Sequence, residues 1–383
     1  MSSHTLNLRV VEVTRETPDA ITIHFEHPEK KVIASKPGQF LTLIVPVRGQ
    51  LERRSYSLCS APHEAPRLAV TVKRLPGGAV SNYLVDACTV GMEMEVFEPM
   101  GTFHVVTGPD KARNMVLIGA GSGITPLMSM AKAVLHEEPQ SRVTLIYGNR
   151  NEDSIIFLNQ LNQLEGQYPG RFRVQHVLSQ PKTGSKKNGA LQAFTSLFKK
   201  KAEAAVPAAP FTPYTGRLNR KMLIDILQAL QLTDYRDTEF YLCGPEGLMD
   251  EAREALKILK VSPDRIHKES FVAAKQKAPA EGEVSAGPEE AAAGHVVTLI
   301  YEGTEYRVPV EKGQTILEAG LDQDIDLPYS CQAGLCTACR GKCLSGKVHL
   351  DEREGLSDAE IEEGYVLNCV GHPLSDDVVI EIG

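Results

Sequence analysis

Four cysteines near the C-terminus restrict the possible folds of this chain more than any other feature. Cys331, Cys336 and Cys339 follow the pattern C-x4-C-x2-C, and Cys369 comes after 29 further residues. Four thiolates with this spacing can hold a [2Fe–2S] cluster. A structural zinc site is the alternative, but zinc sites usually combine two short cysteine or histidine pairs. The spacing therefore predicts a cluster-binding fold at the C-terminal end.

A further cysteine in this region, Cys343, complicates the pattern. With Cys336 and Cys339 it forms a C-x2-C-x3-C run that partly imitates the ligands of bacterial clusters. The complete bacterial run needs another cysteine step and a following proline, whereas Leu344 follows here. We therefore interpret Cys343 as a buried or half-buried thiol outside the cluster. Over about residues 295–383 the region resembles plant-type ferredoxins, which implies a β-grasp fold of the α+β class.

Length, charge and cysteine usage limit the class of protein. The 383 residues predict two or three domains. A net charge of −8 argues against a nucleic-acid partner, which would require a basic face. The first residues lack the pattern of a signal peptide, and glycines and Pro126 interrupt the longest uncharged stretch, so we expect no membrane insertion. Cluster thiolates and the lack of a disulfide framework indicate the cytoplasm.

The pattern of apolar and polar residues changes along the sequence, which predicts a multidomain chain. Residues 5–107 alternate apolar and polar side chains in short runs, as in an antiparallel β-barrel. From Asn114, apolar strands alternate with helical periodicity, as in a doubly wound parallel sheet of the α/β class. The Ala-, Glu-, Pro- and Gly-rich residues 273–294 should form a flexible linker spanning roughly 25 Å. We expect domains at 1–108, 109–272 and 295–383, with an exposed insertion at about 180–212 that includes a short helix around Leu191–Lys200.

Two segments of the expected barrel contain residues suited to phosphate binding. In the run from Arg53 to Ser57, an arginine fork and serine hydroxyls can bind phosphate, and a tyrosine can stack on an aromatic ring. In Gly77–Leu84, glycines precede an expected helix whose N-terminal amides favour an anion. Each segment alone also fits an ordinary strand end or turn. Two phosphate sites in one barrel suit a cofactor with a pyrophosphate.

The Arg-x-Tyr-Ser pattern resembles the flavin site of the ferredoxin-NADP reductase superfamily. The resemblance implies that Arg54 contacts the flavin phosphates, that Tyr56 stacks on the isoalloxazine ring and that Ser57 hydrogen-bonds near its reactive N5. Because the chain lacks the extra glycine insertion of the FMN-dependent relatives, FAD is favoured over FMN. The other expected flavin-binding residues are Ser55, Val72, Lys73, Gly78 and Ser81.

In the second expected domain, a glycine-rich turn follows the first strand. Its sequence, Gly-Ala-Gly-Ser-Gly-Ile-Thr-Pro, lets a pyrophosphate approach the backbone, although tight packing of a turn would also require glycines. Its place after the flavin motif makes it resemble the nicotinamide-nucleotide loop of the same superfamily. The residues of this expected loop are Gly119, Gly121, Gly123, Thr125 and Pro126.

Three later segments agree with this resemblance. Tyr147–Arg150 ends the next strand, where the family meets the adenosine ribose, and Cys243, Gly244 and Pro245 match a loop beside the nicotinamide. A buried core position is the alternative for Cys243. The segment from His267 to Phe271 resembles the terminal segment over the flavin, with an ordinary edge strand as its alternative. The resemblance implies that Glu269 and Phe271 lie near the isoalloxazine, and the candidate catalytic residues are Ser57, Cys243 and Glu269.

The choice between NADPH and NADH depends on the side chains that meet the adenosine ribose. A 2′-phosphate attracts a cation, whereas a free ribose commonly meets a carboxylate. Arg150 follows the appropriate strand, and the resemblance implies that Arg217 also approaches the ribose, as in the family's NADPH users, although Glu152 and Asp153 are close in sequence. We therefore expect NADPH, with NADH as the alternative.

The three expected cofactors form one electron path. A nicotinamide delivers two electrons at once and a [2Fe–2S] cluster accepts one, so a flavin is needed between them. Over nearly its full length the chain resembles reductase components of bacterial multicomponent oxygenases, including those of phenylacetyl-CoA epoxidase and steroid hydroxylases. The resemblance implies an NAD(P)H-dependent oxidoreductase that donates electrons to a partner oxygenase or hydroxylase. A stand-alone ferredoxin-NAD(P) reductase serving other acceptor proteins and a flavin/iron–sulfur redox sensor are the alternatives.

Overall fold

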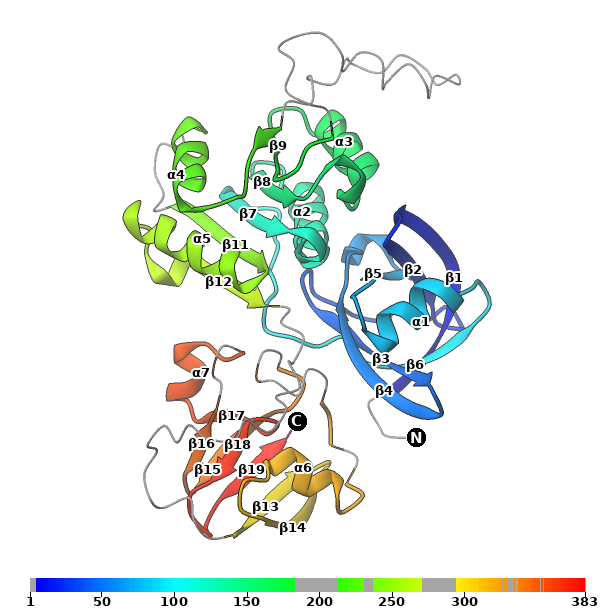
Figure 1. Ribbon diagram of the computed structural model, residues 1–383, viewed down its shortest axis with the longest axis vertical. Helices are drawn as coiled ribbons and strands as arrows, with labels where there is room; N and C mark the ends of the chain where they lie inside the picture. The colour runs from blue at the N-terminus through cyan, green and yellow to red at the C-terminus, as the bar shows by residue number, and fades with distance from the viewer. Residues whose placement is uncertain are drawn as a thin grey trace.

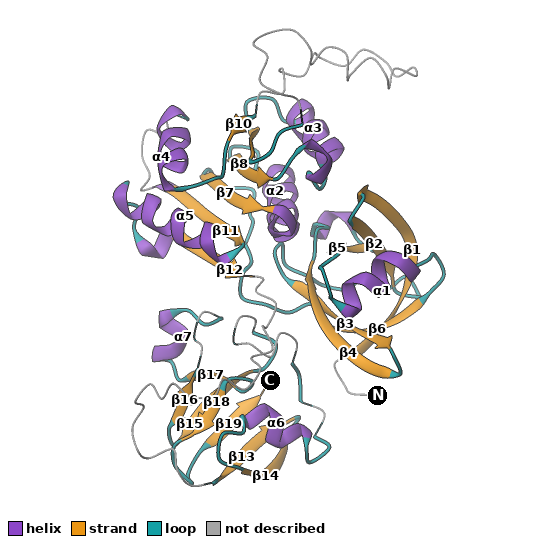
Figure 2. Ribbon diagram, viewed as in Figure 1, coloured by secondary structure: helices purple, strands orange, loops and turns teal. Residues whose placement is uncertain are grey.

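Three principal sheets follow one another along the chain (Figure 1). The computed structural model describes residues 5–182, 213–230, 237–270, 294–325, 327–329, 334, 337–351, 353 and 355–382. The first sheet is antiparallel, the second is parallel and flanked by helices, and the third is mixed (Figure 2). This order confirms the expected three-part fold. The expected helix around Leu191–Lys200 and nearly all of the expected linker lie outside the described residues.

The N-terminal sheet is antiparallel and curls into a barrel. Its strand order is β4-β3-β6-β1-β2-β5, and an isolated bridge between Leu58 and Val70 brings its two ends together. Alternate residues such as Ile21, Ile23 and Phe25 are buried in one core, as the period of a strand requires. The elements are β1 (Thr5–Thr17), β2 (Ala20–Glu26), β3 (Phe40–Val47), β4 (Gln50–Ser57), β5 (Leu68–Lys73), α1 (Ala79–Ala87) and β6 (Glu93–Phe97).

The second sheet is parallel throughout, with the strand order β10-β9-β8-β7-β11-β12. The elements are β7 (Asn114–Ala120), α2 (Ile124–Glu137), β8 (Arg142–Asn149), α3 (Leu158–Gln167), β9 (Phe172–Leu178), β10 (Tyr214–Thr215), α4 (Arg220–Ala229), β11 (Thr238–Gly244), α5 (Glu246–Ile258) and β12 (Ile266–Ser270). The chain first builds outward from β7 through β8 and β9, and later returns to the other side of β7. The strand order therefore reverses between β7 and β11, where open α/β sheets form their ligand crevice.

Both faces of this sheet are covered by helices. Leu117 of β7 packs in one core with residues of α2 and α3, including Leu127 and Leu161. Its neighbour Val116 points to the opposite face and packs with residues of α4 and α5, including Leu223. Burial on both faces explains why the strands are nearly continuous apolar runs in the sequence.

The C-terminal unit is a five-stranded sheet of order β14-β13-β19-β15-β17, with β16 and β18 paired separately. The elements are β13 (His295–Tyr301), β14 (Thr304–Val310), α6 (Ile316–Leu321), β15 (Arg340–Ser345), β16 (Val348–Leu350), α7 (Asp358–Glu362), β17 (Tyr365–Leu367), β18 (Gly371–Pro373) and β19 (Val379–Ile382). The first and last strands, β13 and β19, lie side by side in parallel. Residues of α6, such as Ile316, pack on the sheet with Val297 and Leu299.

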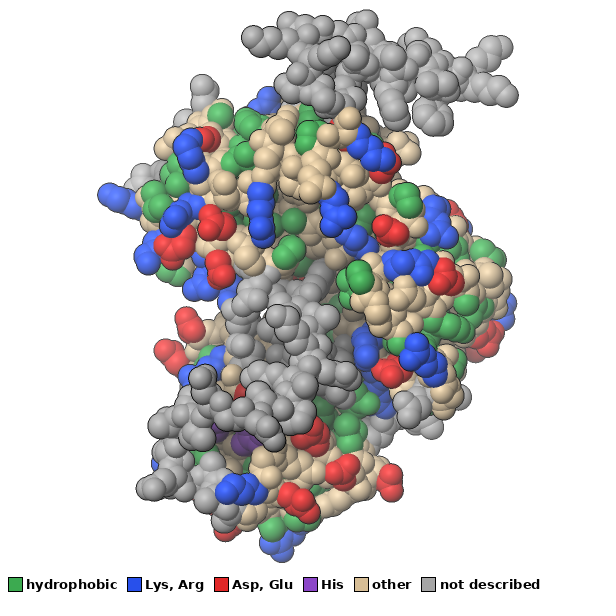
Figure 3. Space-filling model, viewed as in Figure 1, with side chains coloured by type: hydrophobic (Ala, Val, Ile, Leu, Met, Phe, Trp, Pro, Cys, Tyr) green, Lys and Arg blue, Asp and Glu red, His purple; other side chains and the backbone are tan. Residues whose placement is uncertain are grey.

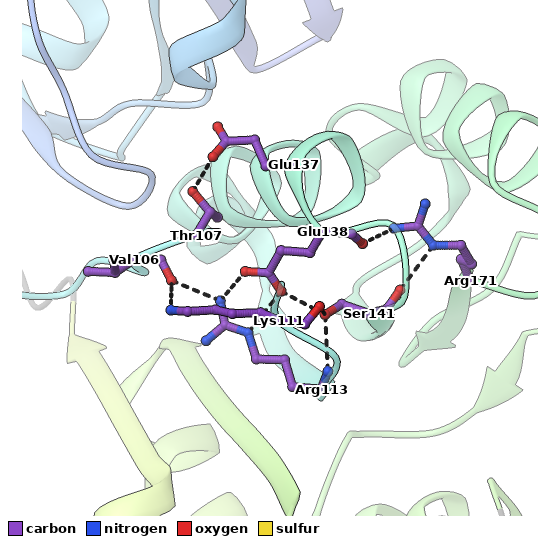
Figure 4. A network of polar contacts seen from close by, with 8 residues as sticks. All are labelled: Val106, Thr107, Lys111, Arg113, Glu137, Glu138, Ser141 and Arg171. Atoms are coloured by element: carbon purple, nitrogen blue, oxygen red, sulfur yellow. Dashed lines mark hydrogen bonds and ion pairs between the residues drawn. The ribbon is translucent and has the colours of Figure 1, made fainter. Parts of the chain in front are cut away.

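A buried carboxylate fixes the connection between the barrel and the parallel sheet (Figure 4). Glu138, at the end of α2, is fully buried and accepts hydrogen bonds from Arg113 at 2.7 and 3.1 Å and from Ser141 Oγ at 2.7 Å. Arg113 Nη2 also donates to the carbonyl oxygen of Val106 at 3.1 Å. Because Val106 and Arg113 lie at the two ends of the connecting segment, the ion pair holds that segment against α2.

An open cavity of about 1140 Å³ separates the parallel-sheet unit from the C-terminal unit. Its lining includes the basic residues Arg253 and Lys257 of α5 on one side and the acidic residues Asp358 and Glu360 of α7 on the other. Figure 3 shows acidic side chains at the edge formed by α7 and basic side chains at the neighbouring edge of the parallel-sheet unit. Helices α5 and α7 therefore present side chains of opposite charge to this space, although Glu254 and Asp264 also line the first side and Arg353 lines the second.

Candidate functional site

Neighbouring strands of the parallel sheet bring separate sequence motifs into one row. Tyr147 of β8, Gly119 of β7, Cys243 of β11 and Glu269 of β12 are successive register partners. All four lie near the carboxyl ends of their strands, beside the point where the strand order reverses. Ligands of open parallel sheets bind at this edge. The row therefore places the glycine loop, the Cys243 loop and Glu269 around one site.

The barrel meets this row through a hydrogen bond between two candidate catalytic residues. Ser57, at the end of β4, donates from Oγ to Glu269 Oε2 at 3.4 Å. Burial raises the pKa of the Glu269 carboxyl to about 8, although the hydrogen bond from Ser57 acts in the opposite direction. A carboxyl group with a pKa near neutrality can hold or release a proton under physiological conditions. The junction of the two units thus contains an acid that is suited to proton transfer.

Cys243 is a neutral thiol in the same row. Its side chain is fully buried, and burial raises its pKa well above the ordinary value, with the neighbouring Glu269 charge as the second cause. A buried core position was the alternative for this residue, and the burial agrees with it. The register also sets Cys243 between Gly119 and Glu269, so the same thiol lies in the site.

Packing against β11 shapes the glycine loop. A Cβ at Gly123 would lie 2.1 Å from the carbonyl oxygen of Cys243, so tight packing excludes any side chain there. Gly121 has a positive φ of 56°, and its carbonyl oxygen accepts a hydrogen bond from the buried Tyr147 hydroxyl at 2.9 Å. Thr125, which like Pro126 is buried in the first turn of α2, donates to the Ser122 carbonyl at 3.0 Å. Packing therefore explains Gly123, and a left-handed turn explains Gly121.

Lys73 of the barrel reaches across to the glycine loop of the parallel sheet. A Cβ at Gly121 would lie 3.4 Å from Lys73 Nζ. The pKa of Lys73 is lowered, mainly by burial and secondly by the positive charge of Arg150. Two cations beside a glycine loop fit the phosphates of a nucleotide. The resemblance assigned Lys73 to flavin binding, and the only sequence signal for its side chain is a cation at the end of an apolar strand.

The other expected flavin-binding residues lie along β4, β5 and the start of α1. Tyr56 is half-buried against the barrel core, and Val72 is fully buried. Arg54 is exposed, with its guanidinium 3.1 Å from Glu52. Gly78 is the N-cap residue of α1, and a Cβ there would lie 2.7 Å from Ser81 Oγ. Ser55 Oγ lies 2.9 Å from Thr42 Oγ1, and Ser81 Oγ accepts from the Leu75 amide at 3.2 Å.

The loop that precedes α5 completes the nucleotide edge. Gly244 is buried beside Ala120, and Pro245 is exposed at the start of α5. Arg217 lies near this helix start, because a Cβ at Gly247 would be 3.8 Å from its Nη2. The residues from His267 to Ser270 belong to β12, an edge strand, as the alternative interpretation predicted. Phe271 lies outside the described residues.

Two of the four predicted cluster ligands are described, and they lie close together. Cys339 and Cys369 are both buried. The backbone amide and Nδ2 of Asn368 donate to the carbonyl oxygen of Cys339 at 3.1 and 2.9 Å, which brings the segments containing the two cysteines together. No sequence pattern indicated this role of Asn368. Buried thiols from distant segments fit two ligands of one [2Fe–2S] cluster. Cys331 and Cys336 lie outside the described residues.

Cys343 lies on β15 and packs against the same hydrophobic core as Cys339 and Cys369. It is half-buried, as we interpreted it, and its Sγ donates to the carbonyl oxygen of Ser345 at 3.1 Å. Burial raises the pKa of its thiol. A thiol held neutral in this way is a poor metal ligand, because metals bind the thiolate.

Comparison with known proteins matches each of the three units to a family. An oxidoreductase FAD-binding domain matches residues 7–105, an oxidoreductase NAD-binding domain matches residues 117–205, and a 2Fe-2S iron-sulfur cluster binding domain matches residues 299–374. The cofactors expected from the sequence, FAD, a nicotinamide nucleotide and a [2Fe–2S] cluster, are therefore confirmed as classes.

Curated relatives align with this chain from end to end. The ferredoxin reductase component of 3-ketosteroid-9-alpha-monooxygenase from Mycolicibacterium smegmatis is 35% identical, over 99% of this chain and 98% of the relative. A 1,2-phenylacetyl-CoA epoxidase subunit from Escherichia coli is 32% identical, over 98% and 97% of the two chains. The glycine betaine monooxygenase reductase subunit from Chromohalobacter salexigens is 29% identical, over 96% and 93%.

One solved structure covers all three parts of this chain, and another covers a portion of it. Phthalate dioxygenase reductase superimposes with a TM-score of 0.55 at 23% identity, covering 99% of this chain and 98% of its own. A cytochrome P450 reductase from Amycolatopsis superimposes with a TM-score of 0.54 at 27% identity, covering 70% of this chain and 71% of its own. No helix in the described part of the chain has the length and apolar character needed to span a bilayer.

Proposed function

The chain belongs to the family of oxygenase reductase components, and we propose that it carries electrons from NADPH through FAD and a [2Fe–2S] cluster to the oxygenase of a phenylacetyl-CoA epoxidase-like system. The observation that carries this proposal is the 3.4 Å hydrogen bond between Ser57 and Glu269, because it joins the flavin barrel to the nucleotide edge of the parallel sheet. FAD, when bound, accepts two electrons together and releases them singly, as a one-electron cluster requires. We assign residues 1–108 to the flavin domain, 109–272 to the nucleotide domain and 295–383 to the cluster domain, joined by the linker 273–294.

Ser57, Cys243 and Glu269 surround the place where nicotinamide and flavin would meet. Glu269 would hold a proton on its carboxyl group at neutral pH, because its pKa is raised to about 8. Ser57 would orient that group through its hydroxyl. The fully buried Cys243 would exclude water from the row and would remain a thiol. Tyr56 would stack on the flavin ring, and Arg54, Ser55, Val72, Gly78 and Ser81 would hold the rest of the flavin.

Two cations would share the recognition of the nicotinamide nucleotide. Lys73 lies beside Gly121, so it would meet the pyrophosphate that NADPH and NADH have in common. Arg150 follows β8 and would meet the 2′-phosphate that only NADPH carries. Gly119, Gly244 and Pro245 would line the same edge, and the buried Thr125 and Pro126 would support the loop from below.

Replacing each cation in turn tests this division. Arg150→Ala should raise KM for NADPH by roughly tenfold or more and leave KM for NADH nearly unchanged, because one charge-assisted hydrogen bond is worth about 1.5–3 kcal/mol. Lys73→Ala is the matched control and should raise KM for both nucleotides by similar factors. Equal effects of Arg150→Ala on the two nucleotides would refute the NADPH assignment.

The acceptor assignment needs an assay with purified oxygenase components. We expect NADPH oxidation by this chain to be coupled to product formation by a phenylacetyl-CoA epoxidase. A 3-ketosteroid 9α-monooxygenase is the second candidate, because its reductase component aligns equally completely with this chain. Coupling to neither oxygenase would favour a stand-alone electron donor. Cluster thiolates and the lack of a disulfide framework support a cytoplasmic location.

A further inference from the structure

Arg53 of the flavin barrel makes contacts with the cluster domain on residues that lead to the cluster loop. Its Nη1 donates to the carbonyl oxygen of Leu327 at 2.9 Å. Its guanidinium carbon lies 4.8 Å from the ring centroid of Tyr329 and 5.2 Å from that of Phe97, which belongs to β6 of the barrel. The guanidinium thus contacts one aromatic ring from each domain and bonds the cluster domain directly.

The segment that accepts the hydrogen bond from Arg53 packs in the core of the cluster domain. Leu327 is fully buried in the core of that domain, and its amide donates to the carbonyl oxygen of Ile325 at 2.7 Å. A Cβ at Gly320 would lie 2.4 Å from Leu327 Cδ1, so the leucine side chain occupies the space beside α6. Because Leu327 is fixed in this core, a hydrogen bond to its carbonyl oxygen restrains the position of the whole cluster domain.

The same contact is close in sequence to residues of both redox sites. Arg53 is four residues before Ser57 on β4, a separation of about 13 Å along a strand, and both side chains point to the same face. Leu327 is four residues before the predicted ligand Cys331, a separation of at most about 14 Å along the chain. One arginine therefore connects the strand that carries the flavin motif to the segment that enters the cluster loop.

We propose that Arg53 is an intramolecular docking residue that holds the cluster domain on the flavin barrel and so sets the rate of electron transfer between the two cofactors. The dependent step moves one electron from reduced FAD to the oxidised cluster, with NADPH as the reductant and the acceptor protein as the oxidant. No covalent bond changes in this step. Arg53 touches neither cofactor in this proposal and acts only as a positioning residue.

Four variants of the full-length holoprotein distinguish the contribution of the Arg53 charge from that of the Tyr329 ring. Arg53→Met keeps an apolar stem beside Phe97 but removes the charge and all donors. Tyr329→Phe keeps the ring under the guanidinium, whereas Tyr329→Leu removes it. Arg9→Met is the matched control, because Arg9 is an exposed arginine of the same barrel whose partner, Glu93, also belongs to the barrel.

Rapid-mixing absorbance separates the two electron-transfer steps. In Arg53→Met and Tyr329→Leu, NADPH should reduce the flavin at the wild-type rate. Arg53→Met should reduce its cluster about tenfold more slowly, a factor equivalent to about 1.4 kcal/mol of lost docking. Tyr329→Leu should slow cluster reduction by a smaller factor, because the hydrogen bond from Arg53 to the Leu327 carbonyl remains. Tyr329→Phe and Arg9→Met should match the wild type. The double variant Arg53→Met/Tyr329→Leu should be no slower than Arg53→Met alone, since Arg53→Met already removes the ring contact that Tyr329→Leu removes. Unchanged cluster reduction in Arg53→Met, or loss of bound flavin, would overturn the proposal.

A measurement that requires no turnover gives independent evidence. Small-angle X-ray scattering of the oxidised protein should show a larger radius of gyration for Arg53→Met than for the wild type and Arg9→Met. An unchanged radius would overturn the docking role. Docking matters for catalysis only if electrons pass from FAD to the cluster, as proposed above. If the wild type failed to reduce its cluster, that path would be refuted, whereas the scattering would still decide whether Arg53 holds the domain.

Discussion

Replacing Glu138 with glutamine removes one charge at the joint between the flavin and nucleotide domains and keeps the shape of the side chain. In the native protein this carboxylate is completely buried and faces Arg113, whose side chain is 18% exposed. Removing one partner of a buried ion pair typically costs about 3–5 kcal/mol, because the other charge is left uncompensated. Arg113 keeps some solvent and its bond to Val106, so we expect a loss near the lower value, about 3 kcal/mol.

Calorimetry of the variant measures this loss. A loss of about 3 kcal/mol in a domain of this size lowers Tm by roughly 6–12 °C. A multidomain chain does not unfold in a single step, so the transition of the nucleotide domain has to be resolved by differential scanning calorimetry. Flavin reduction by NADPH should also slow, because the joint sets the position of the barrel relative to the nucleotide edge.

Two further variants decide whether the unpaired charge is the cause. Glu137→Gln is the matched control, because Glu137 is half-buried and accepts a hydrogen bond from the Thr107 hydroxyl at 2.5 Å, so its loss should stay at about 1 kcal/mol. The double variant Arg113→Met/Glu138→Gln should recover part of the stability, since no buried charge remains unpaired. Equal and small shifts for Glu137→Gln and Glu138→Gln would refute the anchoring role of the pair.

Further predictions concern the two redox sites. In the folded protein the pKa of Glu269 is raised from 4.5 to about 8. The protonated Glu269 therefore stabilises the fold fully below about pH 4.5, and this contribution is lost as pH rises to about 8. Tm of the wild type should fall over this range relative to Tm of Glu269→Gln. Parallel pH dependence in both proteins would contradict the raised pKa. Gly123→Ala should give little folded protein in an expression and solubility assay, because the added Cβ would lie 2.1 Å from the Cys243 carbonyl oxygen. Gly166→Ala is the control, because a Cβ at Gly166 would meet open space. Cys369→Ser should lose the cluster absorbance and keep bound flavin, and retention of the cluster would exclude Cys369 as a ligand.

Local sequence patterns predicted the sheets well, because each pattern reflects a local cause. Alternation in residues such as Ile21, Ile23 and Phe25 comes from the period of a half-buried strand. The continuous apolar run around Val116 and Leu117 comes from a strand covered on both faces. Because each of these patterns depends only on residues that are close together in the chain, a single sequence is enough to detect it.

Contacts between domains could not be predicted in this way. Ser57 and Glu269 are 212 positions apart, and only the packing of the barrel on the parallel sheet brings them together. The approach of Lys73 to Gly121 depends on the same packing, so the sequence indicated only a strand that ends in a cation. Arg53 also stands in a motif whose other members point to a flavin, which concealed its contact with the cluster domain. No periodicity records such long-range partners.

The cavity between the nucleotide domain and α7 would couple the distance between these two units to water activity. Closing a space of about 1140 Å³ would return water molecules on the order of tens to the bulk solvent. Solutes excluded from protein surfaces favour states that expose less surface. A cell that accumulates such osmolytes would therefore hold this reductase more closed, and one that lowers its ionic strength would strengthen the attraction between Arg253 or Lys257 and the acids of α7. Electron delivery by this protein should thus respond to the osmotic and ionic state of the cell without any dedicated effector site.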